Sequence, residues 1–191
     1  MSFPRPESLL DDATPQNHES QSGDLLLLAR LDQSREMESE PVDLRTLIEE
    51  SVASAKAAGP DHPITLTLPN DDLFILGDSH RIHQVISNLL ANARTHTPAG
   101  TPITITASQD ERGTTVEIAD QGPGLSTEDQ ARIFERFYRA DPSRVRNGGE
   151  GSGLGLSIVD AVMKAHGGYV SVRSELGKGA TFTLFFPMKD I

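Results

Sequence analysis

The chain has 191 residues, no cysteine and a formal net charge of −11. This length suffices for one domain with a hydrophobic core, and the lack of cysteine excludes disulfides and thiolate metal sites. The acidic balance argues against a nucleic-acid or anionic-membrane surface, because either would need a basic patch. We therefore expect no nucleic-acid partner and no direct membrane contact.

The first 40 residues differ in composition from the rest of the chain. Residues 1–23 carry three prolines and neither valine nor isoleucine, so we predict a disordered tail. Residues 24–40 begin with a leucine-rich stretch that is typical of a helix packed against another helix, and they continue as a polar linker. Asp43 then caps a predicted helix that Gly59 and Pro60 end.

Five later segments alternate apolar and polar residues with the period of a β-strand: 64–68, 103–107, 115–119, 169–173 and 180–186. Residues 73–76 form a shorter candidate strand. Helices are predicted between the strands, at about 79–95, 127–137 and 153–166. Residues 41–191 are therefore predicted to form an α/β (α+β) sandwich, in which three helices cover one face of a mixed, mostly antiparallel five-stranded sheet.

The helix that follows Asp78 has two distinct faces. Apolar residues recur at helical spacing and predict the buried face: Ile82, Val85, Ile86, Leu89, Leu90 and Ala93. Asn88, Asn92 and His96 stand four residues apart and form a second stripe. Since asparagine is a poor helix former, we interpret the stripe as functional, with amide oxygens suited to Mg²⁺. The alternative is that both asparagines only cap or solvate the helix.

The sequence Asp120-Gln-Gly-Pro-Gly124 follows a predicted strand. A carboxylate at this place can accept a hydrogen bond from an exocyclic amine such as that of adenine. The glycines would let a flat ring lie against the backbone. The same pattern is also that of an ordinary turn, which is the alternative interpretation.

Two further segments are suited to phosphate. Five of the 17 Lys and Arg residues lie between positions 132 and 146, among three aromatic residues. All five are arginines, whose guanidinium group can donate two parallel hydrogen bonds to a phosphate. The alternative is a solvated, arginine-rich helix. Five glycines then lie between Gly148 and Gly155, directly before an apolar helical stretch. Such a loop brings backbone N–H groups to an anion, although a flexible loop has the same composition.

Taken in order, these motifs resemble the ATP-binding catalytic domain of a bacterial two-component sensor histidine kinase, a member of the GHKL superfamily of ATPases (HATPase). The resemblance covers about residues 41–188. It is carried by an N box at 88–93 followed by His96-Thr97-Pro98, glycine boxes at 120–124 and 151–155, an F box at 134–139 and a last glycine motif at 177–182. It implies the GHKL fold, ATP and Mg²⁺ as cofactors, and transfer of the γ-phosphate to a histidine of a phosphoacceptor domain, with relay to a response regulator.

The resemblance also implies a role for each motif. Asn92 would hold Mg²⁺, Asn88 would act at the phosphate end, and Asp120 would bind the adenine amine. Arg139 would approach the γ-phosphate as a second catalytic residue. The remaining nucleotide-binding residues would be His96, Gly122, Gly124, Phe134, Gly151, Gly153, Leu154, Gly155 and Thr181, with residues 140–152 as a mobile lid.

The chain departs from the family pattern at three places. Thr95 stands where many members have a Lys or Arg that touches phosphates, and His96 stands where many have Tyr. The third departure concerns the family's phosphoacceptor histidine, which lies on a two-helix dimerisation hairpin. Residues 25–32 resemble only the end of that hairpin, and His18-Glu19 is a weak imitation of its histidine motif. We therefore predict that the phosphorylated histidine lies outside this chain, in a split kinase or in another part of a longer one.

The other histidines are not assigned to the site. His80, His83 and His166 lie at predicted helix ends, as surface or capping residues, and His62 lies in a predicted loop.

Other proteins with this fold provide alternatives. ATPases of the gyrase and chaperone type carry a glutamate base where Asn88 stands, and an amide cannot act as that base. Anti-sigma serine kinases lack the Phe-Glu-Arg-Phe-Tyr-Arg pattern of residues 134–139. A non-catalytic nucleotide-binding module is a third alternative, because Thr95 removes one phosphate contact. Whichever function applies, we expect this chain to be a monomer in the cytoplasm, or the cytoplasmic part of a membrane-bound sensor.

Overall fold

The computed structural model describes residues 39–59, 61–140 and 153–189. Its elements, in chain order, are β1 (Glu40–Asp43), α2 (Leu44–Ala58), β2 (Ile64–Thr67), β3 (Phe74–Gly77), α3 (Ser79–Thr95), β4 (Ile103–Asp110), β5 (Gly113–Asp120), α4 (Thr127–Arg132), α5 (Gly155–Ala165), β6 (Tyr169–Glu175) and β7 (Gly179–Pro187). The predicted tail, nearly all of the predicted hairpin end and linker, and the predicted lid after residue 140 lie outside the described residues.

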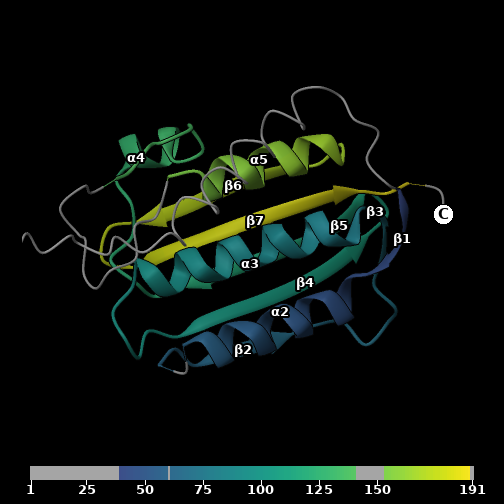
Figure 1. Cartoon of the computed structure of the whole chain (residues 1–191), viewed down its shortest axis with the longest axis horizontal. Coiled ribbons are helices and arrows are strands. Elements are labelled where there is room, and N and C mark those ends of the chain that lie inside the picture. Colours follow the sequence, from purple (N-terminus) through teal and green to yellow (C-terminus); the bar gives the residue numbers. More distant parts are fainter. Residues whose placement is uncertain (1–38, 60, 141–152, 190–191) are drawn as a thin grey trace, which may run out of the picture.

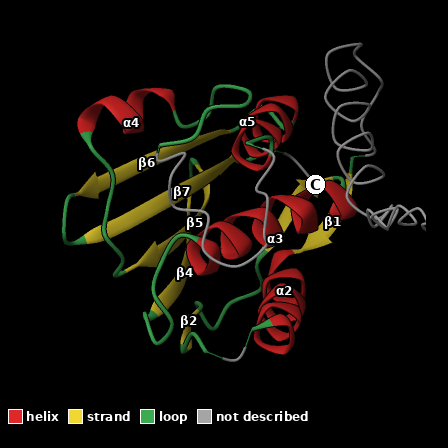
Figure 2. Cartoon of the chain, turned by 60° about the vertical axis from the view of Figure 1, so that its left-hand side comes forward, coloured by secondary structure: helices red, strands yellow, loops and turns green. Residues whose placement is uncertain are grey.

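The main sheet has five strands in the order β2-β4-β5-β7-β6. The pair β2 and β4 is parallel, and the other neighbours are antiparallel. The helices α2, α3 and α5 lie side by side along one face of this sheet (Figures 1 and 2). The predicted fold class, with a mixed, mostly antiparallel sheet covered by three helices, is therefore confirmed.

A second, two-stranded sheet forms at one end of the molecule. The short strand β1 pairs antiparallel with β3, so that Val42 lies opposite Ile75. Residues 73–76 were a candidate strand, but β1 was not predicted from the sequence. It has four residues, one of them a proline, and only Val42 is buried, which is too little alternation to indicate a strand.

The helix predicted at 127–137 is shorter than expected, because α4 ends at Arg132. Turns follow it, in which the Glu135 N–H donates to the Arg132 carbonyl at 2.8 Å. Phe137 then has a φ of 63°, a left-handed conformation that cannot continue a right-handed helix. Hydrophobic spacing alone gave no sign of this turn.

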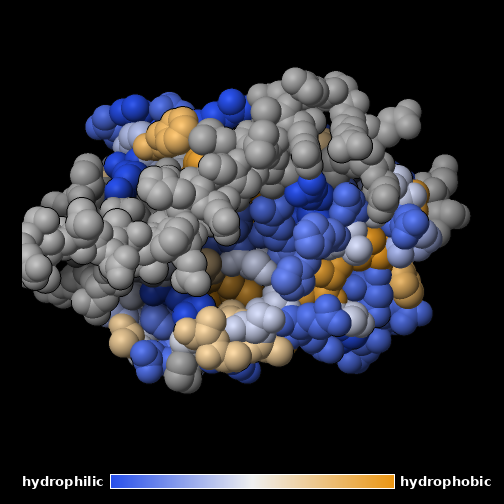
Figure 3. Space-filling model, in the orientation of Figure 1, coloured by the Kyte–Doolittle hydropathy of each residue, from blue (hydrophilic) through white to orange (hydrophobic). Residues whose placement is uncertain are grey.

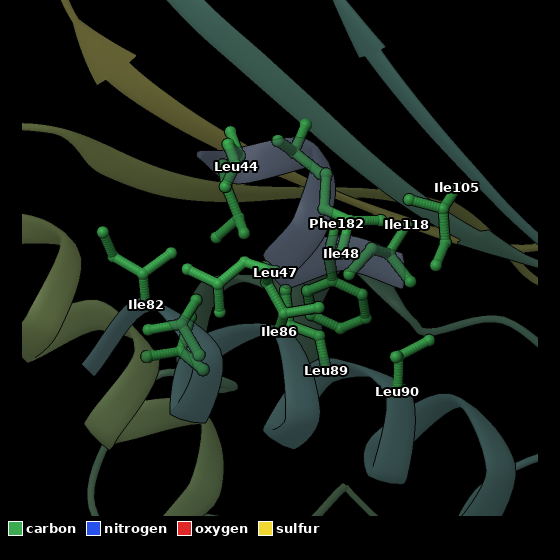
Figure 4. Close-up of a cluster of buried hydrophobic side chains, with 14 of the residues drawn as sticks. Leu44, Leu47, Ile48, Ile82, Ile86, Leu89, Leu90, Ile105, Ile118 and Phe182 are labelled. Carbon is green, nitrogen blue, oxygen red and sulfur yellow. The ribbon is translucent and has the colours of Figure 1, made fainter. Parts of the chain in front are cut away.

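The helix α3 lies at the centre of the helical layer, between α2 and α5 (Figure 1). Its buried residues are the six that the apolar spacing predicts. They pack against Leu47 and Ile48 of α2 and against the sheet residues Ile105, Ile118 and Phe182 (Figure 4). Asp78 caps the helix, since its carboxylate accepts a hydrogen bond from the Arg81 N–H at 3.0 Å, as N-cap residues do. On the outer side of the helical layer, hydrophilic residues cover most of the described surface (Figure 3).

The prediction that His166 is a surface or capping residue is wrong in one respect, because its side chain is buried. The ring lies after α5, with 4% of its surface exposed. Its Nε2 accepts a hydrogen bond from the Asp78 N–H at 3.0 Å, and its Nδ1 donates to the Val162 carbonyl at 2.8 Å. Gly77 leaves the space for the ring, since a Cβ there would lie 2.7 Å from it. His166 therefore joins the end of α5 to the start of α3.

The buried His166 should make stability depend on pH. Burial lowers the pKa of His166 below its ordinary value of 6.5; the Val162 carbonyl and Asp78 favour the protonated ring, and Lys189 disfavours it. With a depressed folded-state pKa, the stabilisation is present above about pH 6.5 and is lost as the pH falls towards the folded-state pKa. Protonated Nε2 can no longer accept from Asp78. Urea unfolding should show a loss of at most about 1.4 kcal/mol per pH unit in that range.

The control is the His166→Phe variant, which keeps an aromatic ring but cannot titrate. It should be less stable than the wild type at pH 8, and this difference should shrink as the pH falls to 5. A second variant, His80→Ala, removes an exposed histidine and should follow the wild-type curve. Parallel pH profiles for the wild type and His166→Phe would contradict this role of His166.

Candidate functional site

The polar stripe of α3 is held in place by the burial of its apolar face. Asn88 and Asn92 are half-buried, and His96 is the C-cap, whose N–H donates to the Asn92 carbonyl at 3.0 Å. The side-chain amide of Asn88 donates to the Gly155 carbonyl at 3.3 Å. Asn88 therefore ties the stripe to the first residue of α5. No side-chain partner for Asn92 is found among the described residues.

The start of α5 leaves backbone N–H groups available. Its N-cap, Leu154, forms no side-chain capping bond, so the first N–H groups of the helix have no capping side chain. A Cβ on Gly155 would meet no heavy atom of the described residues within 4 Å, so the described part of the chain leaves that side of the helix start open. Uncapped N–H groups beside open space suit an anion, to which the helix dipole adds.

Asp120 lies at the end of β5, and its side chain faces the helical layer together with Ile118. The Gly122 N–H donates to its Oδ1 at 2.8 Å. Burial raises the pKa of Asp120, while hydrogen bonds from the backbone of Gly122 and Ala180 and the nearby His96 act in the opposite direction. Asp120 and His96 therefore belong to one site, and this carboxylate is partly desolvated before any ligand binds.

The turn after Asp120 packs closely against the β6–β7 turn. Gly124 has a φ of 71° and Gly179 a φ of 89°. A Cβ on Gly124 would clash with the Glu175 carbonyl, and one on Gly179 would clash with the Asp120 carbonyl. At both positions the lack of a side chain allows two backbone segments to touch, so Gly124 serves the shape of the turn.

The segment that contains the predicted F box is anchored by α4. The Gln130 side chain accepts from the Ser174 N–H at 3.1 Å and donates to the Ser174 carbonyl at 3.0 Å. It therefore pairs with the free edge of β6 as another strand would. The Ser174 hydroxyl also accepts from the Leu125 N–H at 2.8 Å and donates to the Gly179 carbonyl at 2.7 Å. The sequence gave no signal for this network.

The aromatic residues of the predicted F box have separate roles. Phe134 is half-buried and meets Phe182 edge to face, with ring centroids 6.4 Å apart. Phe137 is exposed, and its N–H donates to the Gly153 carbonyl at 3.0 Å. This hydrogen bond joins the segment to the residues just before α5. The Tyr138 hydroxyl donates to the Asp129 carboxylate at 2.7 Å.

The basic residues near the site are mostly engaged elsewhere. Arg132 pairs with Glu135 at 3.3 Å and lies over the Tyr138 ring. Arg94 points to the C-terminal end of α2, because a Cβ on Gly59 would collide with its guanidinium group. Lys178 forms an exposed ion pair at 2.7 Å with Glu175.

In this conformation, neither Arg94 nor Lys178 therefore replaces the basic side chain that many family members have at the position of Thr95. Arg139 is exposed at the end of a described range. Arg144 and Arg146 lie outside the described residues.

One predicted site residue lies on the wrong face of the sheet. The buried residues Ala180, Phe182 and Leu184 alternate along β7 and face the helices, so Thr181 points to the other face. Asp120 pairs directly with Ala180, which therefore takes the place that we expected for Thr181. The site role of the motif at 177–182 stays a prediction, in which Ala180 and not Thr181 has its side chain on the face that carries Asp120.

The predicted site residues also include Leu154 and Gly151. Leu154 is buried in the hydrophobic core, with 1% of its surface exposed, so its side chain supports the start of α5 and does not line a pocket. Gly151 lies outside the described residues. The other predicted positions, among them His96, Gly122, Gly153 and Gly155, lie in the segments that converge around the start of α5 and the end of β5.

Asn92 is chemically suited to a magnesium ion. The described residues contain no group of three or more His, Asp or Glu side chains that could hold a metal. A hard cation at this place would therefore be held by an amide oxygen together with phosphate and water oxygens, which is a usual environment for Mg²⁺. The half-buried Asn92 amide, which has no partner in the described part of the chain, fits this role.

The fold and the site together define a class of protein. An asparagine-bearing helix, a partly desolvated aspartate at a glycine turn and an uncapped helix start meet on one side of a mixed sheet. This arrangement is that of a nucleotide-binding α/β sandwich.

Comparison with known proteins identifies the family. Residues 77–190 match the model of the histidine kinase-, DNA gyrase B- and HSP90-like ATPases. The chain therefore belongs to this family, as a catalytic domain of the sensor histidine kinase type. It is 49% identical over 154 residues to the probable sensor histidine kinase TcrY of Mycobacterium tuberculosis, and the aligned residues cover 81% of this chain and 32% of TcrY. It is 39% identical to the sensor histidine kinase TrcS of the same species, with an alignment that covers 86% of this chain and 33% of TrcS.

Solved structures agree with this assignment. The full-length ShkA structure in complex with AMPPNP is 32% identical, with a TM-score of 0.76 over 91% of this chain and 37% of that one. The mycobacterial sensor histidine kinase MprB is 29% identical, with a TM-score of 0.69 over 80% of this chain and 99% of that one. The chain spans about a third of the length of TcrY and TrcS. In the described part of the chain, no helix is long and apolar enough to cross a membrane.

The desolvated Asp120 should lower the stability of the ligand-free protein at neutral pH. Because burial raises the pKa of Asp120 above its ordinary value, its contribution to stability is present in acid and is lost as the pH rises through the folded-state pKa. The Asp120→Asn variant should therefore be more stable than the wild type at pH 7, and the difference should shrink towards pH 4. Urea unfolding without nucleotide measures both.

Asp129 provides a matched control of opposite sign. Hydrogen bonds from the side chains of Ser126 and Tyr138 lower the pKa of Asp129, so Asp129→Asn should destabilise the protein at pH 7. An Asp120→Asn variant that is less stable than the wild type at pH 7 would contradict the assigned environment of Asp120.

Proposed function

We propose that this chain binds Mg-ATP and transfers the γ-phosphate to a histidine on a phosphoacceptor domain, from which it passes to a response regulator. The reaction would take place in the cytoplasm, where ATP is available. The family membership supports nucleotide binding. The observation that carries the proposal is that α3 connects the two predicted ends of the site, since Asn88 donates to the Gly155 carbonyl and His96 lies near Asp120. The phosphoacceptor domain and the regulator are partners that we infer from the family.

Each end of the site has a defined task in this proposal. At the base end, the Asp120 carboxylate accepts a hydrogen bond from the adenine amine, and Gly122 provides a flat backbone surface. At the phosphate end, the N–H groups of α5 and the Asn92 amide face the phosphates. A bound Mg²⁺ neutralises charge on the phosphates during transfer. Asn88, held by Gly155, orients the phosphate end, and Arg139 lies on the segment that leads towards it.

A nucleotide-binding module without transfer activity is the second candidate. One observation favours it. Thr95 stands where many family members have a basic residue, while Arg94 lies over the end of α2 and Lys178 pairs with Glu175. Neither Arg94 nor Lys178, among the described residues, therefore replaces that basic residue, and the loss of one phosphate contact would lower the rate of transfer more than the binding of the base.

The assigned roles predict different effects at the two ends of the nucleotide. Asp120→Ala should lower the affinity for ATP and ADP at least tenfold, with or without Mg²⁺, because it removes a charge-assisted hydrogen bond to the base. Asn92→Ala should weaken ATP mainly when Mg²⁺ is present. Isothermal titration calorimetry of both nucleotides, with Mg²⁺ or EDTA, measures these effects.

Matched controls are available on one exposed loop. Asn70 and Asp72 are exposed, so Asn70→Ala and Asp72→Ala should bind like the wild type. Unchanged nucleotide affinity in both Asn92→Ala and Asp120→Ala would remove the site assignment.

Phosphoryl transfer distinguishes the two candidates. Incubated with labelled ATP alone, the chain should stay unlabelled. With a histidine-containing hairpin domain of a related kinase and its response regulator, label should appear first on the hairpin and then on the regulator. Binding of Mg-ATP without any transfer would favour the second candidate, and acid-labile phosphate on His18 would contradict a phosphoacceptor outside this chain.

A further inference from the structure

The buried residue His62 contacts Thr97, the neighbour of the predicted site residue His96. It lies in the loop between α2 and β2, and 8% of its surface is exposed. Its Nε2 lies 3.0 Å from the Thr97 hydroxyl oxygen. Thr97 follows α3, directly after His96. Neither the family pattern nor the assigned site roles include His62, which the sequence identified only as a loop residue.

The direction of the hydrogen bond follows from the other contact of Thr97. The Thr97 hydroxyl donates to the Ala93 carbonyl at 2.8 Å. A hydroxyl has one hydrogen to donate and accepts with its lone pairs, so Thr97 must accept from His62. The Nε2 of His62 therefore carries a hydrogen, and the two bonds together fix the rotamer of Thr97.

The fixed Thr97 side chain forms part of the support of the base end. A Cβ on Gly122 would lie 2.5 Å from Thr97 Cγ2, so the Thr97 methyl group packs directly against the Gly122 backbone. The Gly122 N–H in turn donates to Asp120 Oδ1 at 2.8 Å. Contacts thus run without a gap from His62, through Thr97 and Gly122, to the carboxylate at the base end.

Backbone hydrogen bonds hold the residues on both sides of His62. On one side, the Asp61 carbonyl accepts from the Gly100 N–H at 2.7 Å, and on the other the Pro63 carbonyl accepts from the Ile103 N–H at 2.9 Å. The α2–β2 loop is therefore joined by backbone hydrogen bonds to the residues that follow α3. This arrangement places the His62 ring accurately enough to orient another side chain.

We infer that His62 is a positioning residue for the adenine end of the site, which it stabilises through Thr97 and the Gly122 backbone. The inference rests on the proposed function, because it assumes that adenine binds at Asp120. Loss of one neutral hydrogen bond costs about 1 kcal/mol, or about fivefold in affinity. Since the affected contacts lie at the base, ATP and ADP should lose affinity by the same factor.

The test uses the full 191-residue chain and calorimetric titration with ATP, ADP and tripolyphosphate in Mg²⁺. His62→Ala and Thr97→Val should each lower the affinity for ATP and ADP about fivefold, and any affinity for tripolyphosphate should stay unchanged. Valine keeps the shape of threonine but neither donates nor accepts. His62→Gln retains an N–H donor and should restore affinity to within about twofold of the wild type. His80→Ala is the control for loss of a histidine elsewhere.

A double variant separates positioning from general destabilisation. His62→Ala combined with Thr97→Val should bind no more weakly than either single variant, because both remove the same hydrogen bond. Thermal melting without nucleotide identifies the folded variants, and Thr97→Val, which preserves volume, carries the test if His62→Ala does not fold.

Several outcomes would overturn the inference. These are wild-type affinity in Thr97→Val, a loss for ATP that exceeds the loss for ADP, or a His62→Gln variant as weak as His62→Ala. A wild-type chain that binds neither ATP nor ADP would instead contradict the proposed function, and the inference would fail with it.

Discussion

Burial of the apolar face of α3 is the constraint on which the rest of the site depends. Six side chains of this helix are buried against α2, α5 and the sheet, and together they leave the helix no freedom to rotate about its axis. Asn88 and Asn92 therefore point where the core places them. Asn88 then bonds to the first residue of α5, so the proposed phosphate end is positioned by hydrophobic packing more than by polar contacts.

The parts of the fold that follow from local periodicity were predicted correctly, and the parts that depend on tertiary contacts were not. The strands of the main sheet alternate clearly, and α3 has its apolar residues at helical spacing. By contrast, β1 exists because β3 is there to pair with it, and α4 ends at Arg132, ahead of the turn in which the Phe137 N–H donates to the Gly153 carbonyl. The buried position of His166 requires Gly77 on a distant strand. No window of sequence contains these partners.

The same distinction applies to the site. Family motifs predicted its segments, but side-chain direction within a strand alternates at every residue, so that Thr181 was assigned where Ala180 pairs with Asp120. The network of Gln130 and Ser174 and the contact of His62 with Thr97 were missed for another reason. Each joins residues more than 30 positions apart, and Gln, Ser, His and Thr are common surface residues with no distinctive spacing. Their positions, and not their types, give them a role.

The glycines show how differently the two ends of the site are built. At the base end, Gly122, Gly124 and Gly179 are surrounded by protein atoms that a Cβ would strike, and Asp120 is already hydrogen-bonded. This end is formed before any ligand arrives, which lowers the entropic cost of binding the base. At the proposed phosphate end, a Cβ on Gly155 would meet no described heavy atom within 4 Å, and the N-cap residue of α5 forms no side-chain capping bond. In the proposed function, phosphate oxygens would accept hydrogen bonds from the first N–H groups of α5, where the positive end of the helix dipole favours a negative charge.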